Sequence, residues 1–288
     1  GMVQSRRTIN LSPDGKRFAW ERIAANASDI WITDLEHSTD TRLTFDPPFN
    51  RGPVWSPDGK RVAFASQRTT PNLELYLRDS NGTGQDEAIQ LESKNGKVPH
   101  DWSRDGRFLI YVDSDPKTKI DLWALPMKDG KPAGKPIPLV RGAFDETHGQ
   151  LSPDGHWLAY SSNESGIWQV YVQPFAPGSD KPVSGKWQIS TSGGAMPRWR
   201  GDGKELFYYA LDRKLMAVEI RANGQAFEHA TPQALFEARS SVAVDNNAEF
   251  AYAVTSDGKR FLVPVPSGAT VEAPPLTVVV NWLAGVKK

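Results

Sequence analysis

One short phrase recurs six times along this 288-residue chain. Each copy has an apolar residue, a turn built on Ser-Pro-Asp-Gly or a close variant, a basic or polar residue and then an apolar run. Its Asp recurs at intervals of 44, 47, 49, 48 and 55 residues: Asp14, Asp58, Asp105, Asp154, Asp202 and Asp257. A period of this length, with several short strands in each unit, is typical of the blades of a β-propeller.

The second repeat shows how four strands fit into one unit. A short strand at Gly52–Trp55 runs into the turn Ser56–Gly59, in which Pro presets φ and Gly accepts a positive φ. Alternating β-rich segments follow at Arg61–Ala65 and Leu73–Arg78, and Ala88–Leu91 supplies the fourth strand. The repeat therefore predicts an all-β fold, a six-bladed β-propeller of mostly four-stranded antiparallel blades, as a single domain over residues 1–288.

The same pattern places third and fourth strands in the other repeats. These pairs are Asp29–Asp34 and Thr41–Thr44, Asp121–Pro126 and Lys135–Leu139, Gln169–Gln173 and Trp187–Ser190, and Lys214–Ile220 and Gln233–Phe236. The sixth unit offers only three strands, at Phe250–Val254, Arg260–Val265 and Leu276–Trp282. Only Val3–Arg7, near the N-terminus, could supply a fourth strand to this unit. We therefore expect a three-stranded last blade or an outer strand lost with upstream sequence. Gly1 ahead of Met2 resembles a tag remnant, which fits an N-terminal truncation.

Charge and composition restrict the classes of partner. Lys plus Arg and Asp plus Glu are equal at 34 each, so no global field favours nucleic acid or an anionic membrane. Cysteine is absent, which excludes disulfides and thiolate metal sites. No apolar stretch approaches the roughly 18 residues of a transmembrane helix, and no signal peptide is recognisable. We predict a monomer with no metal, no cofactor, no nucleic-acid partner and no membrane insertion by this chain.

The recurring Asp beside Ser could suggest catalysis or metal binding. A turn explains Ser, Pro, Asp and Gly together, and carboxylates on separate blades are not expected to converge. The large rings before three of the turns, Trp55, Trp102 and Trp199, are expected to pack between blades rather than stack on a ligand. Neither a GxSxG nucleophile elbow nor an HExxH zinc motif occurs, and we predict no catalytic residues.

The fourth and fifth repeats carry further sequence beyond the turn. Six runs resemble one family. They are NESGIWQVYVQPFAPGS from Asn163, KWQISTSGGAMPRWRGDGKELFYY from Lys186, KLMAVEI from Lys214, TPQALF from Thr231, SDGKRFLV from Ser256 and LTVVVNW from Leu276. They are similar to the TolB-like propeller at the C-terminus of many bacterial serine/threonine protein kinases. The resemblance spans about Leu11 to Trp282.

That resemblance implies a non-catalytic, six-bladed propeller that binds a protein or a small ligand, as a scaffold or as the sensor domain of a larger bacterial signalling protein. It also implies a periplasmic or otherwise extracytoplasmic location. Kinase activity is not implied, because the Gly-rich, HRD and DFG motifs are absent. The WD dipeptide of WD-repeat proteins is absent too.

Functional groups in a propeller gather where the innermost strands meet one mouth of the central channel. Positions four to seven before each turn Asp, and those just upstream, supply the candidates for binding a ligand or partner: Arg51, His100, Asp101, Asp145, Glu146, His148, Gln150 and Arg198. Asn10 and Thr147 occupy the same window. These groups could also satisfy one another in a hydrated channel.

Two other functions stay open. A metal-assisted lyase or hydrolase could use His100 and His148 at the channel, as oligogalacturonate lyases use channel histidines, although two histidines are a thin ligand set. The chain could also be the propeller part of a prolyl-oligopeptidase-like protease, whose α/β-hydrolase domain would not fit within 288 residues.

Overall fold

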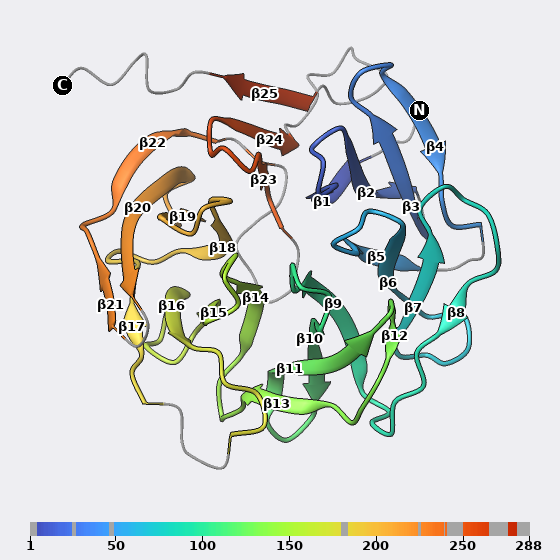
Figure 1. Cartoon of the computed structure of the whole chain (residues 1–288), viewed down its shortest axis with the longest axis horizontal. Helices are drawn as coiled ribbons and strands as arrows, with labels where there is room; N and C mark the ends of the chain where they lie inside the picture. Colours follow the sequence, from blue (N-terminus) through green and yellow to red (C-terminus); the bar gives the residue numbers. More distant parts are fainter. Residues whose placement is uncertain are drawn as a thin grey trace.

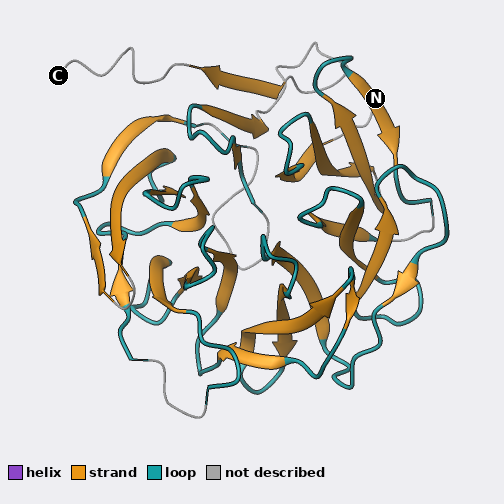
Figure 2. Cartoon of the chain, viewed as in Figure 1, coloured by secondary structure: helices purple, strands orange, loops and turns teal. Residues whose placement is uncertain are grey.

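Antiparallel strands account for all of the regular secondary structure that is described. The computed structural model describes residues 5–24, 27–45, 49–179, 184–223, 226–238, 240, 250–264 and 276–280. No helix occurs within these ranges (Figure 2), and consequently none that could cross a membrane. The sheets follow one another in chain order around a central axis, with their first strands nearest to it (Figure 1). The chain therefore has the propeller architecture that its repeat predicts.

The first three sheets come from the first half of the chain. The first contains β1 (Ser5–Leu11), β2 (Arg17–Ala24), β3 (Ala27–Asp34) and β4 (Thr39–Arg42). The second contains β5 (Asn50–Trp55), β6 (Arg61–Ser66), β7 (Glu74–Asp79) and β8 (Glu87–Ala88). The third contains β9 (Gly96–Trp102), β10 (Phe108–Asp115), β11 (Lys119–Lys128), β12 (Lys131–Pro132) and β13 (Ile137–Val140).

The other three described sheets come from the second half. The fourth contains β14 (Glu146–Leu151), β15 (Trp157–Ser162), β16 (Gln169–Pro174) and β17 (Trp187–Gln188). The fifth contains β18 (Ala195–Trp199), β19 (Glu205–Tyr209), β20 (Lys214–Asn223), β21 (Ala226–His229) and β22 (Gln233–Glu237). The last contains β23 (Ala253–Val254), β24 (Arg260–Pro264) and β25 (Leu276–Val280).

The predicted strand order is confirmed, and most differences lie at the outer edges. One innermost strand differs too, because the strand predicted at Phe250–Val254 is the two-residue β23. The third and fifth sheets each gain an outer hairpin, because β11 and β20 run past the predicted strands and fold back as β12 and β21. The fourth strand predicted at Ala88–Leu91 is a two-residue β8 instead, although the Ile89 N–H still donates to the Leu75 carbonyl at 2.8 Å. The predicted ends Val265 and Trp282 lie outside the described residues.

The recurring phrase forms the turn between the first and second strands of each sheet. In the first copy, the Asp14 carboxylate accepts hydrogen bonds from Ser12 Oγ at 2.5 Å and from the Lys16 N–H at 3.0 Å. The Ser12 Oγ in turn accepts the Arg17 N–H at 2.9 Å. The hydrogen bonds from the Ser12 hydroxyl and the Lys16 N–H therefore lower the pKa of Asp14. Together they outweigh burial, which acts to raise it. The turn role predicted for Ser and Asp is confirmed.

The hydrophobic core lies between neighbouring sheets rather than within one. One cluster, for example, joins Ala19 and Ile30 of the first sheet to Trp55 and Phe64 of the second. Another joins Ile9 and Phe18 of the first sheet to Ala253 and Leu262 of the last, so the first and last described sheets pack directly on each other. Each fully buried large apolar side chain contributes roughly 1.5–3 kcal/mol, which no single small sheet could gain alone.

Candidate functional site

A β-bulge interrupts the innermost strand of five sheets at nearly the same register. The pairing skips Thr8 in β1, Gly52 in β5, His100 in β9, His148 in β14 and Met196 in β18. Three of these non-glycine residues have a positive φ, with values of 33° at Thr8, 56° at His148 and 61° at Met196. Bulges re-aim side chains, and non-glycine residues held at positive φ concentrate at functional sites.

Two of the bulge side chains, His100 and His148, stack on each other inside the channel. Their ring centroids are 5.8 Å apart with an interplanar angle of 12°, and Phe250 meets both rings edge-on. His100 is 1% exposed, and its Nδ1 accepts the Gly149 N–H at 3.3 Å, which places its proton on Nε2. Burial above all, with His148 and Arg198 nearby, holds the pKa of His100 well below 6.5. His100 is therefore neutral at pH 7.

The surroundings of this histidine pair supply few further metal ligands. Within the described ranges, no group of three or more His, Cys, Asp or Glu side chains is arranged to hold a metal ion. A catalytic zinc site uses three protein ligands. The two stacked histidines are thus an incomplete ligand set as far as the described residues go.

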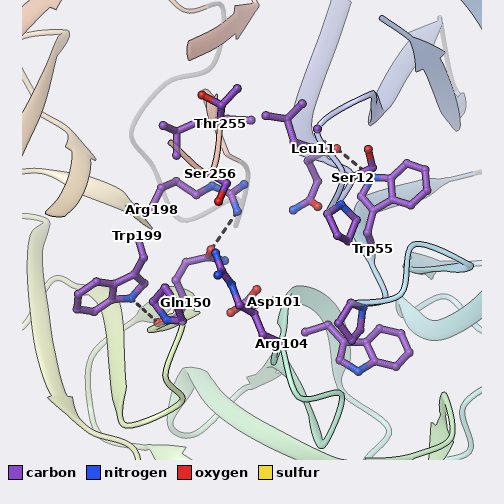
Figure 3. Close-up of a pocket in the computed structure, with 18 of the residues that line it drawn as sticks. Leu11, Ser12, Trp55, Asp101, Arg104, Gln150, Arg198, Trp199, Thr255 and Ser256 are labelled. Carbon is purple, nitrogen blue, oxygen red and sulfur yellow. Dashed lines mark hydrogen bonds between the residues drawn. The ribbon is translucent and has the colours of Figure 1, made fainter. Parts of the chain in front are cut away.

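A cavity of about 630 Å³ opens where the innermost strands reach the recurring turns. Three of the predicted residues line it, Asp101, Gln150 and Arg198 (Figure 3). Trp55, Trp102 and Trp199 also line it. These tryptophans are buried between sheets, as predicted, and they border the cavity as well.

Turns from several sheets surround the cavity, and Asp14 and Asp257 both line it. We did not expect turn carboxylates on separate blades to approach a common site. Each is nevertheless engaged locally, since Asp14 accepts from Ser12 Oγ and Asp257 from Thr255 Oγ1, both at 2.5 Å. A rim arginine, Arg104, reaches from the third sheet to donate to the Gly201 carbonyl of the fifth at 2.9 Å.

Arg198 lies at the inner side of this cavity, on β18. Its guanidinium donates to Gln150 Oε1 at 3.1 Å and to the Ile9 carbonyl at 3.3 Å, and it lies 3.8 Å from the centroid of the Phe250 ring. Figure 3 shows Arg198 and Gln150 pointing toward one another. Gln150 is held in turn, because its Nε2 donates to the His100 carbonyl at 2.8 Å. This network joins the cavity to the histidine pair.

Asp101 is an acidic residue in the same wall. Its Oδ2 accepts the Leu151 N–H at 2.7 Å. Burial raises the pKa of Asp101 to about 6, against the lowering effects of the Leu151 N–H and of Arg198. The cavity therefore holds a carboxyl group that changes charge close to neutral pH.

Three predicted residues lie near the other end of the innermost strands. Arg51 Nε is 3.6 Å from Glu21 Oε1, and Asp145 accepts the Asn163 amide at 2.9 Å. Glu146, at the start of β14, is 3% exposed, and burial with nearby Asp121 raises its pKa to about 7. None of the three lines the cavity. The eight predicted residues thus fall into a cavity group, the histidine pair and a group at the far end.

Sequence reasoning missed Thr8, Met196, Phe250 and Tyr252. Tyr252 donates its hydroxyl to the Met196 carbonyl at 2.9 Å, which fixes the bulge that carries Met196. The bulge positions had a usable signal, because Thr8, Gly52, His148 and Met196 all stand six residues before a turn Asp. Phe250 precedes its turn by seven residues, at the edge of the same window.

No model of a known protein family matches the chain. An uncharacterized protein of Agrobacterium fabrum (strain C58) is 43% identical over 155 residues, which cover 52% of this chain and 52% of that protein. A Bacillus subtilis protein described as an uncharacterized peptidase is 28% identical over 192 residues, covering 53% of this chain and 28% of the peptidase. The chain spans about half or less of the length of these curated relatives.

Solved structures resemble the whole of the described fold. TolB from Acinetobacter baumannii superposes with a TM-score of 0.64 at 18% identity, covering 96% of this chain and 61% of TolB. An oligogalacturonate lyase in complex with manganese superposes with a TM-score of 0.58 at 16% identity, covering 96% of this chain and 90% of the lyase. At these identities the likeness establishes the β-propeller fold, which the chain shares with structures that include TolB.

Proposed function

We propose that this chain is a non-catalytic binding propeller that takes a ligand, or a small part of a protein partner, into the cavity at the turn side of its channel. The cavity itself is the main support. Its volume of about 630 Å³ falls within the roughly 300–1,000 Å³ of small-ligand sites. Its lining combines three tryptophans with polar and charged side chains that converge from several sheets.

The proposal includes the domain organisation. The chain forms a ring of six blades in one domain in this proposal, and the cluster around Ile9 and Leu262, which packs the last described sheet on the first, supports it. The chain acts as a monomer and as the sensor or scaffold part of a larger bacterial protein. The proposal also includes an extracytoplasmic location, for which the fold likeness to TolB is the support.

A substitution that fills the cavity tests this proposal. Asn10 lines the cavity from β1, and its backbone carbonyl already accepts the Trp55 indole N–H at 3.0 Å. The Asn10→Trp variant should therefore keep the fold and occupy the space. Gln85→Trp, at an exposed position, is the matched control. Ligand-observed NMR with a panel of small acids, amides and amines should give hits for wild type and Gln85→Trp that Asn10→Trp loses. The same hits on Asn10→Trp would place binding elsewhere.

Two enzymatic alternatives have narrower support. The fold likeness to a manganese-bound lyase and the stacked pair of His100 and His148 keep a metal-assisted reaction in view. Manganese or zinc should then raise the melting temperature of wild type and not of His100→Asn.

The partial match to a peptidase would suit a chain that is the propeller part of a peptidase. Sequencing the gene on both sides of this segment discriminates, since a hydrolase domain there would favour the peptidase.

A further inference from the structure

Arg198 is a buried cation that the described protein leaves without an ionic partner. It is 8% exposed, and both of its hydrogen bonds go to uncharged oxygens, those of Gln150 and Ile9. Its Nε atom is buried and has no hydrogen-bond partner among the described residues. Asp101 lies close enough to interact electrostatically with Arg198, but no ion pair joins the two side chains among the described residues. Burying a guanidinium without an ion pair carries a large desolvation penalty.

Other well-buried arginines of this chain are paired with carboxylates. Arg78 and Arg68 both bind Asp86, the former at 2.8 Å, and Arg61 binds Glu87 at 2.8 Å. These three arginine side chains are 12–13% exposed, so they are no more buried than Arg198. The missing carboxylate at Arg198 is thus a local feature of the cavity.

The surroundings of Arg198 favour a ligand that joins one negative charge to an apolar body. The indole N–H groups of Trp55, Trp102 and Trp199 already donate to backbone carbonyls, at 3.0, 3.3 and 3.2 Å. Those three N–H groups are therefore not free to donate to a ligand, and the tryptophans contribute no charge to the lining. A planar carboxylate suits the fork of donors on a guanidinium.

We propose that Arg198 is the carboxylate-binding subsite of the cavity and that the ligand is an organic monoanion with an aromatic or aliphatic body. This inference rests on the proposed function and specifies its ligand class. A ligand carboxylate would accept hydrogen bonds from the Arg198 guanidinium and would replace the amide oxygen of Gln150 as an acceptor. Asp14, Asp101 and Asp257 line the same cavity, so a dianion such as a phosphate monoester would meet more repulsion than a monoanion.

The test compares acids with their neutral amides on the full chain at pH 7.5. Suitable probes are phenylacetate and phenylacetamide, indole-3-acetate and indole-3-acetamide, and hexanoate and hexanamide, with phenyl phosphate as the dianion, all measured by calorimetry. Wild type should bind at least one acid about tenfold or more tightly than its amide, which is the order expected for a charge-assisted hydrogen bond. Arg198→Met should lose this preference, and Arg198→Lys should retain part of it.

Two controls separate binding from structure. Arg51→Met removes a cation at the far end of the channel and should keep the preference for acids. The ligand-free Arg198→Met variant should keep the circular dichroism spectrum of wild type and unfold cooperatively, so that a lost preference for acids reports on binding and not on a lost fold.

Each other outcome has a definite meaning. Equal binding of acid and amide to wild type, abolished by Asn10→Trp, would overturn the carboxylate subsite and leave the cavity as the ligand site. A preference for acids that persists in Arg198→Met, or a preference for phenyl phosphate, would also overturn it. If no probe binds wild type at millimolar concentration, the subsite and the proposed cavity function both fail.

Discussion

Replacing Glu146 with Gln should stabilise the protein at neutral and alkaline pH. Glu146 is 3% exposed at the start of β14, its Oε2 has no hydrogen-bond partner among the described residues, and its Oε1 accepts only a long bond of 3.4 Å from Ser162. Burial and the nearby Asp121 raise its pKa from 4.5 to about 7. The Glu146→Gln variant keeps the shape and the Oε1 acceptor but removes the charge.

The magnitude follows from the difference between the pKa values of the folded and unfolded chains. A shift from 4.5 to about 7 corresponds to at most about 3.4 kcal/mol, and partial solvation and relaxation of the site reduce this to about 1–2 kcal/mol. Below pH 4.5 the group is protonated in both states, so its ionisation carries no penalty. Between pH 4.5 and 7 the unfolded chain ionises first, and wild type progressively loses stability relative to Glu146→Gln.

Urea unfolding followed by circular dichroism at constant ionic strength measures this difference. The free energy of unfolding of Glu146→Gln should exceed that of wild type by about 1–2 kcal/mol at pH 8 and should match it near pH 4.5. Glu92→Gln, with a side chain that is 91% exposed, is the control and should show no such trend. A difference that is the same at every pH, or a variant that is less stable than wild type at pH 8, would refute the reasoning.

Two further perturbations test the turn and the histidine pair. Gly155 has a φ of 73°, and no atom lies within 4 Å of an added Cβ, so Gly155→Ala should lose about 1–2 kcal/mol of unfolding free energy from backbone strain alone. Gly142→Ala, at a position without positive φ, should leave the unfolding free energy nearly unchanged. Equal effects of the two substitutions in urea unfolding would contradict the strain argument. The lowered pKa of buried His100 means that the unfolded chain takes up its proton more readily, so stability should fall as pH drops below 6.5. The melting temperature of His100→Asn should fall less than that of wild type between pH 7 and 5, and parallel curves would contradict this explanation.

The repeat sequence predicts the sheets well because each turn is specified locally. Ser12, Asp14 and Gly15 need only their own neighbours to form their turn, so the phrase marks strand ends reliably. The outer edges are less predictable, since β8 and β17 depend on pairing with a neighbouring strand rather than on strong alternation. The extra β11–β12 hairpin did have a local signal in Asp129-Gly130, a dipeptide favoured in two-residue hairpin turns.

The candidate site was predictable only by region. Counting back from each turn Asp located the innermost strands and with them His100, His148 and Arg198. The same window could not separate the two ends of the channel, and so it grouped Arg51 and Glu146 with residues of the cavity. The contact of Phe250 with Arg198 joins segments about 50 residues apart, which no local pattern reports.

Indole N–H chemical shifts test the central claim, that ligands occupy the cavity at the turn side of the channel, most directly. Trp55, Trp102 and Trp199 line the cavity, whereas Trp31 and Trp187 belong to the third and fourth strands of their sheets and do not line it. In a ¹⁵N–¹H spectrum assigned by single Trp→Phe variants, the tightest-binding acid should shift the three cavity indoles and leave Trp31 and Trp187 unchanged. Shifts confined to Trp31 or Trp187, with the cavity indoles unmoved, would contradict the account.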